Sequence, residues 1–220
     1  MKRVTNTTKQ SKKSKKSKKS NKTQQTIQQD RTTPEYVLYW PYIMAMVPFY
    51  DEQNYDCTMV YYVNGIERSY PCSCEQVLED LARVFRTSLD VLRARTEVVA
   101  DKGRWRKMRK FPIAFIVDFV MVPVKCRREC QRNTGTLGYV VYHYVERIER
   151  TASGQCRICF KDAQLQLDIK QQYRGVQYQM ELAEHMNQLT RVEAEYWQFE
   201  ICAAKKAMHA IILKNKKSDK

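Results

Sequence analysis

The chain has 220 residues, 43% of them hydrophobic, which is enough for one domain with a substantial core or for two small domains. Its 39 lysines and arginines outnumber 24 acids, and the formal net charge of +15 favours a polyanionic partner, nucleic acid ahead of an acidic membrane surface. No window approaches the roughly 18 consecutive apolar residues of a membrane span, and the polar run after Met1 lacks the apolar region of a signal peptide. We therefore expect a cytoplasmic protein with its eight cysteines reduced.

Residues 1–31 form a lysine-rich, low-complexity tail in which a Ser-Lys-Lys unit repeats three times between Ser11 and Lys19. The tail holds eleven Lys or Arg and one acid, Asp30. Such a segment cannot bury enough apolar surface to offset the entropy of ordering, so we predict that it is disordered. Two roles stay open: a solvated tail without a specific function, or one that adds nonspecific affinity for phosphates.

An antiparallel meander is predicted after the tail, in a single domain spanning residues 34–213. Two runs rich in aromatic and β-forming residues, 36–40 and 42–48, are predicted strands with Pro41 and Pro48 at their ends. Another strand, 57–63, leads into Asn64-Gly65, which is the strongest short hairpin signal in the chain, and the return strand is expected over 66–70.

Two helices are expected next. Ser73 and Gln76 have the spacing of a capping box, in which Ser73 accepts from a backbone N–H and Gln76 reaches back, and apolar residues at helical spacing carry this helix to about Arg86. A second helix begins with a cap at Thr87 or Ser88, and Gly103 is its expected stop.

Two Lys/Arg clusters then flank a pair of apolar strands, 111–117 and 119–124. Residues 101–132 carry ten basic and three acidic side chains, a net of +7, whereas residues 33–100 have a net of −5. The charge is polarised along the chain, which is the first indication of function.

From residue 135 to the end, the sequence predicts three further strands and then a helical C-terminal part. Gly135 and Gly138 mark a turn, residues 139–145 a strand, and residues 156–160 and 165–169 a hairpin. From Gly175 onward a helical rhythm without Pro or Gly indicates one or two long helices before a basic tail at 214–220. The predicted class is α+β: an antiparallel β-rich core, two helices inserted between the meander and the central strands, and a long helical C-terminus.

Metal binding and catalysis have weaker support. Cys126, Cys130, Cys156 and Cys159 could supply four thiolates to a structural zinc, but the last two fall in a predicted strand where residues three apart point to opposite faces. Buried thiols are the alternative, and we expect no metal or other cofactor. His143, His185 and His209 have no nucleophile or carboxylate in a recognisable arrangement, and glycine-rich phosphate loops are absent from the sequence, so we do not expect an enzyme.

Short segments over roughly residues 35–186 resemble, in order and approximate spacing, the competence transcription factor family, ComK. They are Tyr42 to Pro48, the strand before Asn64, Lys110 to Ile113, Val122-Pro123, Gly138 to Val140 with His143, and Cys159-Phe160 through Leu167-Asp168-Ile169 to Gln177. The family's glycines are missing from residues 85–93, Val124, Tyr139, Lys170 and Met180 replace typical residues, and most of the chain after Leu189 has no counterpart.

The resemblance implies a transcriptional activator of competence (DNA-uptake) genes. Family members bind paired A/T-rich promoter boxes on double-stranded DNA, largely through the minor groove, as dimers that assemble into tetramers. Two other partners are expected. One is an adaptor that delivers the protein to a Clp-type protease, and the other is RNA polymerase. The expected location is cytoplasmic and nucleoid-associated, without a membrane partner.

We expect the DNA contacts to come from the two basic clusters. Arg104, Arg106 and Arg109 would enter a narrow, negative A/T-rich groove, because such a groove favours guanidinium groups. Phosphates would be held by Lys107, Lys110 and Lys125, Trp105 would lie beneath or beside the DNA backbone, and the interface would extend to Arg127 and Arg128. The alternative is a solvated loop that joins a helix to a strand.

A second hypothesis is an interaction or adaptor protein that binds a partner through its C-terminal helix and has only nonspecific affinity for nucleic acid. Its apolar stripe would comprise Tyr178, Leu182, His185, Leu189, Val192, Tyr196, Phe199 and Ala203. Such a stripe is more often part of a core or a homodimer contact, which is the reading that we favour. Deleting residues 1–31 would separate the hypotheses, because a regulator should keep its sequence preference without the tail.

Overall fold

The computed structural model describes residues 33–101, 105, 108, 110–126, 136–161 and 165–218, with side chains described as far as Met208. The predicted disordered tail, 1–31, and the expected helix stop at Gly103 lie outside the described residues. Residues 33–220 form one compact unit by their internal contacts. The predicted α+β class is confirmed, with two antiparallel sheets, helices inserted before the central strands and a long C-terminal helix.

Six strands form the larger sheet, in the order β3-β2-β1-β6-β5-β4, and every neighbouring pair is antiparallel. Their bounds are β1 (Ile43–Tyr50), β2 (Asp56–Tyr62), β3 (Glu67–Tyr70), β4 (Ile113–Ile116), β5 (Phe119–Lys125) and β6 (Leu137–Val141). The smaller sheet is antiparallel with the order β7-β8-β9, and comprises β7 (Val145–Arg150), β8 (Gln155–Phe160) and β9 (Gln166–Gln172). The helices are α1 (Glu35–Leu38), η1 (Trp40–Tyr42), α2 (Cys74–Val84), α3 (Leu89–Asp101), η2 (Tyr142–Tyr144) and α4 (Tyr173–Ser218).

The N-terminal meander is confirmed over β1, β2 and β3, with Gly65 at φ 78° in the turn where Asn64-Gly65 predicted it. The strand predicted over 36–40 is wrong, because these residues form α1 and the start of η1. Pro34 precedes α1 and Pro41 lies in the first turn of η1, where a fixed φ suits a helix. The Tyr36 hydroxyl donates to the Asp80 carboxylate over 2.6 Å, so this segment packs against α2 instead of extending the sheet.

Pro48 does not end β1 as predicted, since the strand continues to Tyr50. It lies opposite Thr58 of β2, while the pairing of β1 with β6 is confined to Ala45 and Met46. The ring of Pro48 lies near Gly138 of β6, where a Cβ would approach Pro48 Cδ to 3.2 Å, so the glycine leaves room for the ring.

Both inserted helices begin with the predicted serine caps. Ser73 Oγ accepts from the Gln76 backbone N–H over 3.2 Å, and Ser88 Oγ accepts from the Val91 N–H over 3.3 Å. The Gln76 side chain donates forward to Asp80 rather than reaching back, so only half of the predicted capping box forms. Asp80 offers Gln76 a carboxylate one turn further along the same helix face.

The strand predicted over 139–145 is also wrong in its extent. β6 ends at Val141, the short helix η2 redirects the chain, and β7 then starts the second sheet. Gly138 lies inside β6 and not in the predicted turn. A Cβ at this position would approach Cys126 Sγ and the Met46 carbonyl oxygen to 2.5 Å each. The glycine is needed for close approach of neighbouring strands.

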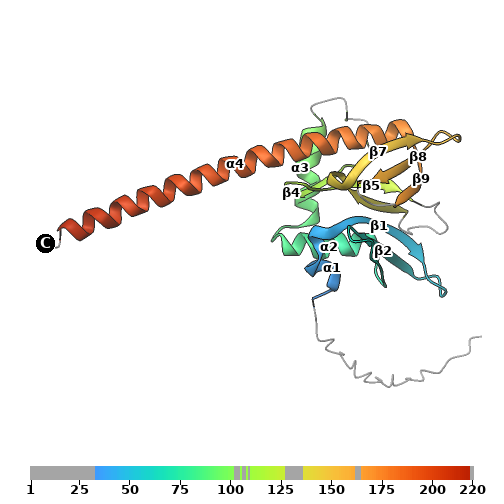
Figure 1. Cartoon of the computed structure of the whole chain (residues 1–220), viewed down its shortest axis with the longest axis horizontal. Helices are drawn as coiled ribbons and strands as arrows, with labels where there is room; N and C mark the ends of the chain where they lie inside the picture. Colours follow the sequence, from blue (N-terminus) through green and yellow to red (C-terminus); the bar gives the residue numbers. More distant parts are fainter. Residues whose placement is uncertain are drawn as a thin grey trace, which may run out of the picture. The chain divides into compact units, whose positions relative to one another are not determined.

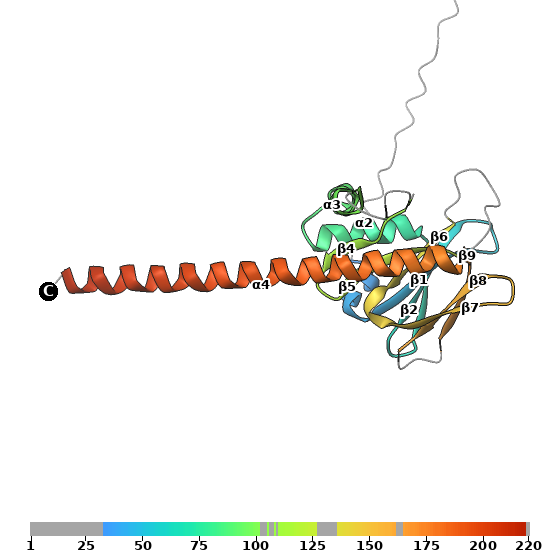
Figure 2. The same cartoon turned by 90° about the horizontal axis from the view of Figure 1, so that it is seen from above.

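Two hydrophobic clusters cover the two faces of the larger sheet. The first joins the sheet to α1, α2 and the start of α3, and includes Val77, Leu81 and Leu92. The second joins it to the smaller sheet and the first part of α4, and includes Ile158, Leu182 and Met186. Figures 1 and 2 show the smaller sheet and α4 together on the side of β5, with α2 on the other side.

The predicted C-terminal helix is one continuous element, α4, which contacts β4 and β5 with its first part. Its remaining length extends beyond both sheets (Figures 1 and 2). Within the described part of the chain, no helix combines the length and the apolar character needed to cross a membrane.

Candidate nucleic-acid interface

Three of the nine predicted DNA-binding residues belong to the described part of the chain: Trp105, Lys110 and Lys125. The other six, Arg104, Arg106, Lys107, Arg109, Arg127 and Arg128, lie outside the described residues. The geometry of the interface is therefore built from the three described residues and from the strands that carry them.

The pairing of β4 with β5 places Lys110 and Lys125, one described residue from each basic cluster, towards one end of the larger sheet. Ile113, the first residue of β4, lies opposite Met121 in this antiparallel pair, so β5 continues to Lys125 in the direction from which residues 110–112 enter β4. Lys110 precedes β4 and Lys125 ends β5, and both side chains are exposed.

A chain of glutamine hydrogen bonds links the backbone at the two lysines. The Lys125 N–H donates to Gln171 Oε1 over 3.2 Å, and Gln171 Nε2 donates to Gln179 Oε1 over 2.8 Å. Gln179 Nε2 in turn donates to the Lys110 carbonyl oxygen over 3.4 Å. Because Gln179 is only 6% exposed, breaking this chain would leave buried amide groups unsatisfied.

Trp105 is anchored on α4. Its ring stacks on His185 with centroids 5.5 Å apart and an interplanar angle of 23°, and it packs against the second hydrophobic cluster. The Met108 N–H donates to the Trp105 carbonyl oxygen over 2.8 Å, and Met108 packs against the same cluster. The Trp105 ring is thus used inside the protein, and a contact with the DNA backbone stays a prediction.

Acidic side chains border this end of the sheet. Glu97 and Asp101, from the end of α3, line a hollow together with Phe111. Asp51 and Glu52 follow β1, whose end lies at the same end of the sheet, two strands away from β5. Carboxylates therefore lie on both sides of the β4–β5 pair at this end of the sheet.

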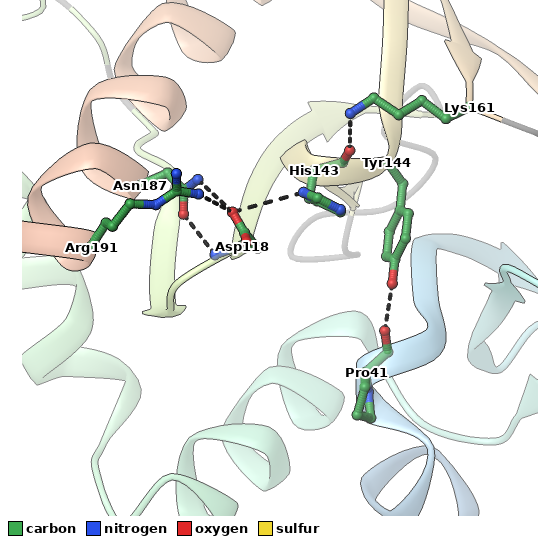
Figure 3. Close-up of polar contacts among 7 residues, drawn as sticks. All are labelled: Pro41, Asp118, His143, Tyr144, Lys161, Asn187 and Arg191. Atoms are coloured by element: carbon green, nitrogen blue, oxygen red, sulfur yellow. Dashed lines mark hydrogen bonds and ion pairs between the residues drawn. The ribbon is translucent and has the colours of Figure 1, made fainter. Parts of the chain in front are cut away.

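The opposite end of the β4–β5 hairpin carries a polar cluster that sequence reasoning missed (Figure 3). Asp118 has φ 62° in the turn, its N–H donates to Asn187 Oδ1 over 2.7 Å, and Asn187 Nδ2 donates to Asp118 Oδ1 over 2.9 Å. Arg191 donates to the same carboxylate over 3.1 Å, and His143 Nδ1 lies 3.8 Å from it. The Asn187 hydrogen bond and the charges of His143 and Arg191 lower the pKa of Asp118.

The neighbours of this cluster tie η2 in place. The Lys161 ammonium donates to the His143 carbonyl oxygen over 2.6 Å, and the Tyr144 hydroxyl donates to the Pro41 carbonyl oxygen over 2.7 Å (Figure 3). His143 lies at the surface beside Asp118 and the Tyr144 ring. These contacts hold the junction between the two sheets.

The described cysteines of the zinc hypothesis are spread over different parts of the fold. Cys156 belongs to the second hydrophobic cluster, where burial raises the pKa of its thiol to about 11. Cys159 lies on the other face of β8, and Cys126 follows β5. Cys130 is outside the described residues. Among the residues that the structure describes, no three His, Cys, Asp or Glu side chains gather in a metal-binding arrangement.

The linking residues Gln171 and Gln179 were not singled out from the sequence. Gln179 did carry a signal, since it is a polar residue on the face of α4 that also holds Val176, Leu182 and Met186. A polar side chain on such a face must find a hydrogen-bond partner when buried. The partner itself, the Lys110 carbonyl, depends on tertiary packing and has no sequence signal.

Comparisons with protein-family models, with curated proteins and with solved structures gave no match for this chain.

Proposed function

We propose that the chain is a sequence-specific, DNA-binding transcriptional activator of the competence type, which contacts A/T-rich promoter sites with the end of the sheet where β4 begins and β5 ends. The observation that supports the proposal is the position of Lys110 and Lys125, one described residue from each basic cluster, whose backbone is linked by the glutamine chain at this end. The sequence resemblance to the ComK family adds the kind of DNA site and the regulatory role.

The proposed mechanism separates positioning from reading. Lysines at the ends of rigid strands would contact phosphates and fix the orientation of the protein, without distinguishing one sequence from another. The arginines at 104, 106 and 109 would enter the minor groove, which is narrow and strongly negative in A/T-rich DNA. Trp105, held on His185, would fix the middle of this arginine segment against α4.

The lysine step is tested by replacing Lys110 and Lys125 with alanine in the full chain. Gel shifts over a salt series would use a promoter fragment with two A/T-rich boxes and a scrambled G/C-rich fragment of equal length. We expect both affinities to fall by about tenfold and the salt dependence to weaken by about two phosphate contacts. A matched variant, Lys205→Ala with Lys206→Ala, removes the same charge from the exposed part of α4 and should bind normally. Equal losses in the two variants would show adhesion by net charge alone.

The reading step is tested with Arg104, Arg106 and Arg109 replaced by alanine. We expect the preference for the A/T-rich fragment to disappear while weak binding to both fragments remains. Unchanged discrimination would overturn the assignment of these arginines. Deleting residues 1–31 should lower the affinity for both fragments and leave the preference intact.

The interaction-protein hypothesis remains the second proposal, because α4 continues past the sheets with an exposed apolar surface. In that case, the chain without residues 1–31 would lose DNA binding altogether. The same deletion therefore separates the two proposed functions.

A further inference from the structure

The distal part of α4, residues 191–208, is exposed along its whole length, although it carries several large apolar side chains. One stripe of this segment, which we call the distal stripe, consists of Ala194, Trp197, Ile201, Ala204 and Met208. Trp197 is 63% exposed, Ile201 53% and Met208 64%. An exposed row of this kind on a soluble helix is typical of an interaction surface.

The distal stripe continues the face by which α4 already packs against the sheets. Leu182, Met186 and Thr190 are buried on this face, and Ala194 follows at the next turn. From Ala194 onward the steps alternate between three and four residues, and the sequence continues the pattern to Ile211. This is a 3.5-residue repeat, the pattern of a coiled-coil seam, and the sheets of the same chain do not reach it.

Charge along the distal segment selects the orientation of a partner helix. Its first part carries Arg191 and three acids, Glu193, Glu195 and Glu200, and Lys205 and Lys206 follow. The sequence then adds Lys214, Lys216 and Lys217 and no acid before Asp219. A parallel second copy would align each stretch with its own copy, whereas an antiparallel second copy sets the acidic stretch of one helix against the lysine-rich stretch of the other.

We propose that the distal stripe pairs with the same stripe of a second copy of this chain, as a two-stranded antiparallel coiled coil. The arrangement is two-fold symmetric, so each surface meets its own copy. Around a centre between Cys202 and Ala203, Trp197 faces Met208 of the second copy and Ile201 faces Ala204 of the second copy. Large side chains thus meet small or flexible ones, which allows close packing of the two helices.

A second row, Val192, Tyr196 and Phe199, lies roughly 140° around the helix from the distal stripe, with Glu193 and Glu200 between the two. This row does not continue the buried face of α4, and its repeat reaches a lysine at Lys206. It is therefore outside the seam of the proposed pair. It also supplies matched control positions on the same helix.

The proposal goes beyond the DNA-binding function and is tested without DNA, so each can fail independently. Sedimentation or light scattering of the full chain over a concentration series should show a monomer–dimer equilibrium. Trp197→Glu with Ile201→Glu should raise the dimer dissociation constant by about 100-fold or more, because charges then replace two buried apolar layers in each copy. Tyr196→Glu with Phe199→Glu adds the same charge and should leave the dimer intact. A monomeric wild-type chain, or a dimer that survives the Trp197 and Ile201 substitutions, would overturn the proposal.

Cross-linking tests the antiparallel orientation. In a Cys202→Ser background, Gln198→Cys and Lys205→Cys introduce thiols beside the stripe without changing it. Antiparallel pairing brings position 198 of one copy next to position 205 of the other. A mixture of the two variants should then give a disulfide-linked dimer on mild oxidation, which Gln198→Cys alone should not give. Covalent dimer from Gln198→Cys alone, with none added by mixing, would show that the helices do not run antiparallel.

Discussion

The two parts of α4 have the same apolar rhythm and opposite surroundings. Up to Thr190, the stripe packs against the larger sheet and the second hydrophobic cluster, and Leu182, Ala183 and Met186 are fully buried. Beyond that residue the rhythm continues on an exposed helix. The comparison shows that periodicity identifies the face of a helix that will be buried, whereas the element that covers this face is decided elsewhere in the chain.

The change occurs where four polar contacts, the last along α4 among the described residues, attach the helix to its neighbours. Asn187 and Arg191 bind Asp118 in the β4–β5 turn. Arg95 of α3 donates to Thr190 over 3.4 Å and forms an ion pair with Glu193. Four predictions follow from this boundary, in order of decreasing effect.

The largest difference is expected between two methionines of the same helix. Met186→Ala should lower the free energy of unfolding by about 2–5 kcal/mol, because it opens a cavity among fully buried side chains. Met208→Ala, at a 64% exposed site, should change it by less than about 0.5 kcal/mol. Urea unfolding followed by near-UV circular dichroism, at one low protein concentration, measures both. Similar losses in the two variants would mean that the distal part is covered by its own chain.

A smaller effect is expected at Asp118, because 41% of its side chain is exposed and solvent screens the ion pairs. Asp118→Asn tolerates the positive φ and keeps a hydrogen-bonding oxygen, so we expect a loss of only about 0.5–1 kcal/mol near neutral pH. Urea unfolding of both proteins measures this difference, and Glu195→Gln is the control for removing one exposed carboxylate from the chain.

The pH dependence of the same pair of proteins gives a sharper test. The pKa of Asp118 is lowered by folding, so its stabilising effect is complete above the ordinary carboxylate pKa of about 4 and is lost as pH falls through the lower folded value. The difference between wild type and Asp118→Asn should therefore shrink as the pH falls below about 4. A difference that stays constant down to pH 2 would contradict the role of the charge.

The smallest effect on stability is expected at Glu193, the last of the α4 residues named above. Glu193→Gln removes the ion pair with Arg95. Because the Glu193 side chain is 54% exposed and the Arg95 side chain 30%, the free energy of unfolding should fall by at most about 0.5 kcal/mol. The loss should disappear in 1 M salt, because exposed ion pairs are screened. A salt-independent loss would indicate that the Glu193 side chain contributes by packing.

The sequence was most informative where local chemistry specifies structure. Asn64-Gly65 determined a hairpin, serines capped α2 and α3, and apolar runs gave β4 and β5. It failed where tertiary contacts override composition. Aromatic residues at 36–40 have β propensity, yet the prolines around them and the bond from Tyr36 to Asp80 place them in short helices. The break at η2 has no glycine or proline to announce it.

The candidate site was predicted in part. Charge counting located the basic clusters, but only the strand register brings Lys110 and Lys125 to one end of the sheet. Gln171 and Gln179, which link the backbone at the two lysines, lie far from them in sequence. Their side chains carry the same amide group as every other glutamine, so the sequence does not distinguish them. Positions fixed by tertiary hydrogen bonds of this kind have no local pattern.

The glutamine chain also means that the length of α4 would set the distance between the basic ends of two paired copies. Gln179 attaches the helix to the basic end of the sheet at one point, and the proposed pairing centre lies between Cys202 and Ala203 further along the same rigid element. At 1.5 Å per residue, two paired copies would hold their Gln179 anchors roughly 70 Å apart along the helix axis. Two turns of B-form DNA span about the same length. A pair of copies would thus match half-sites two turns apart, and inserting or removing one helical turn of α4 before residue 194 would change the preferred spacing.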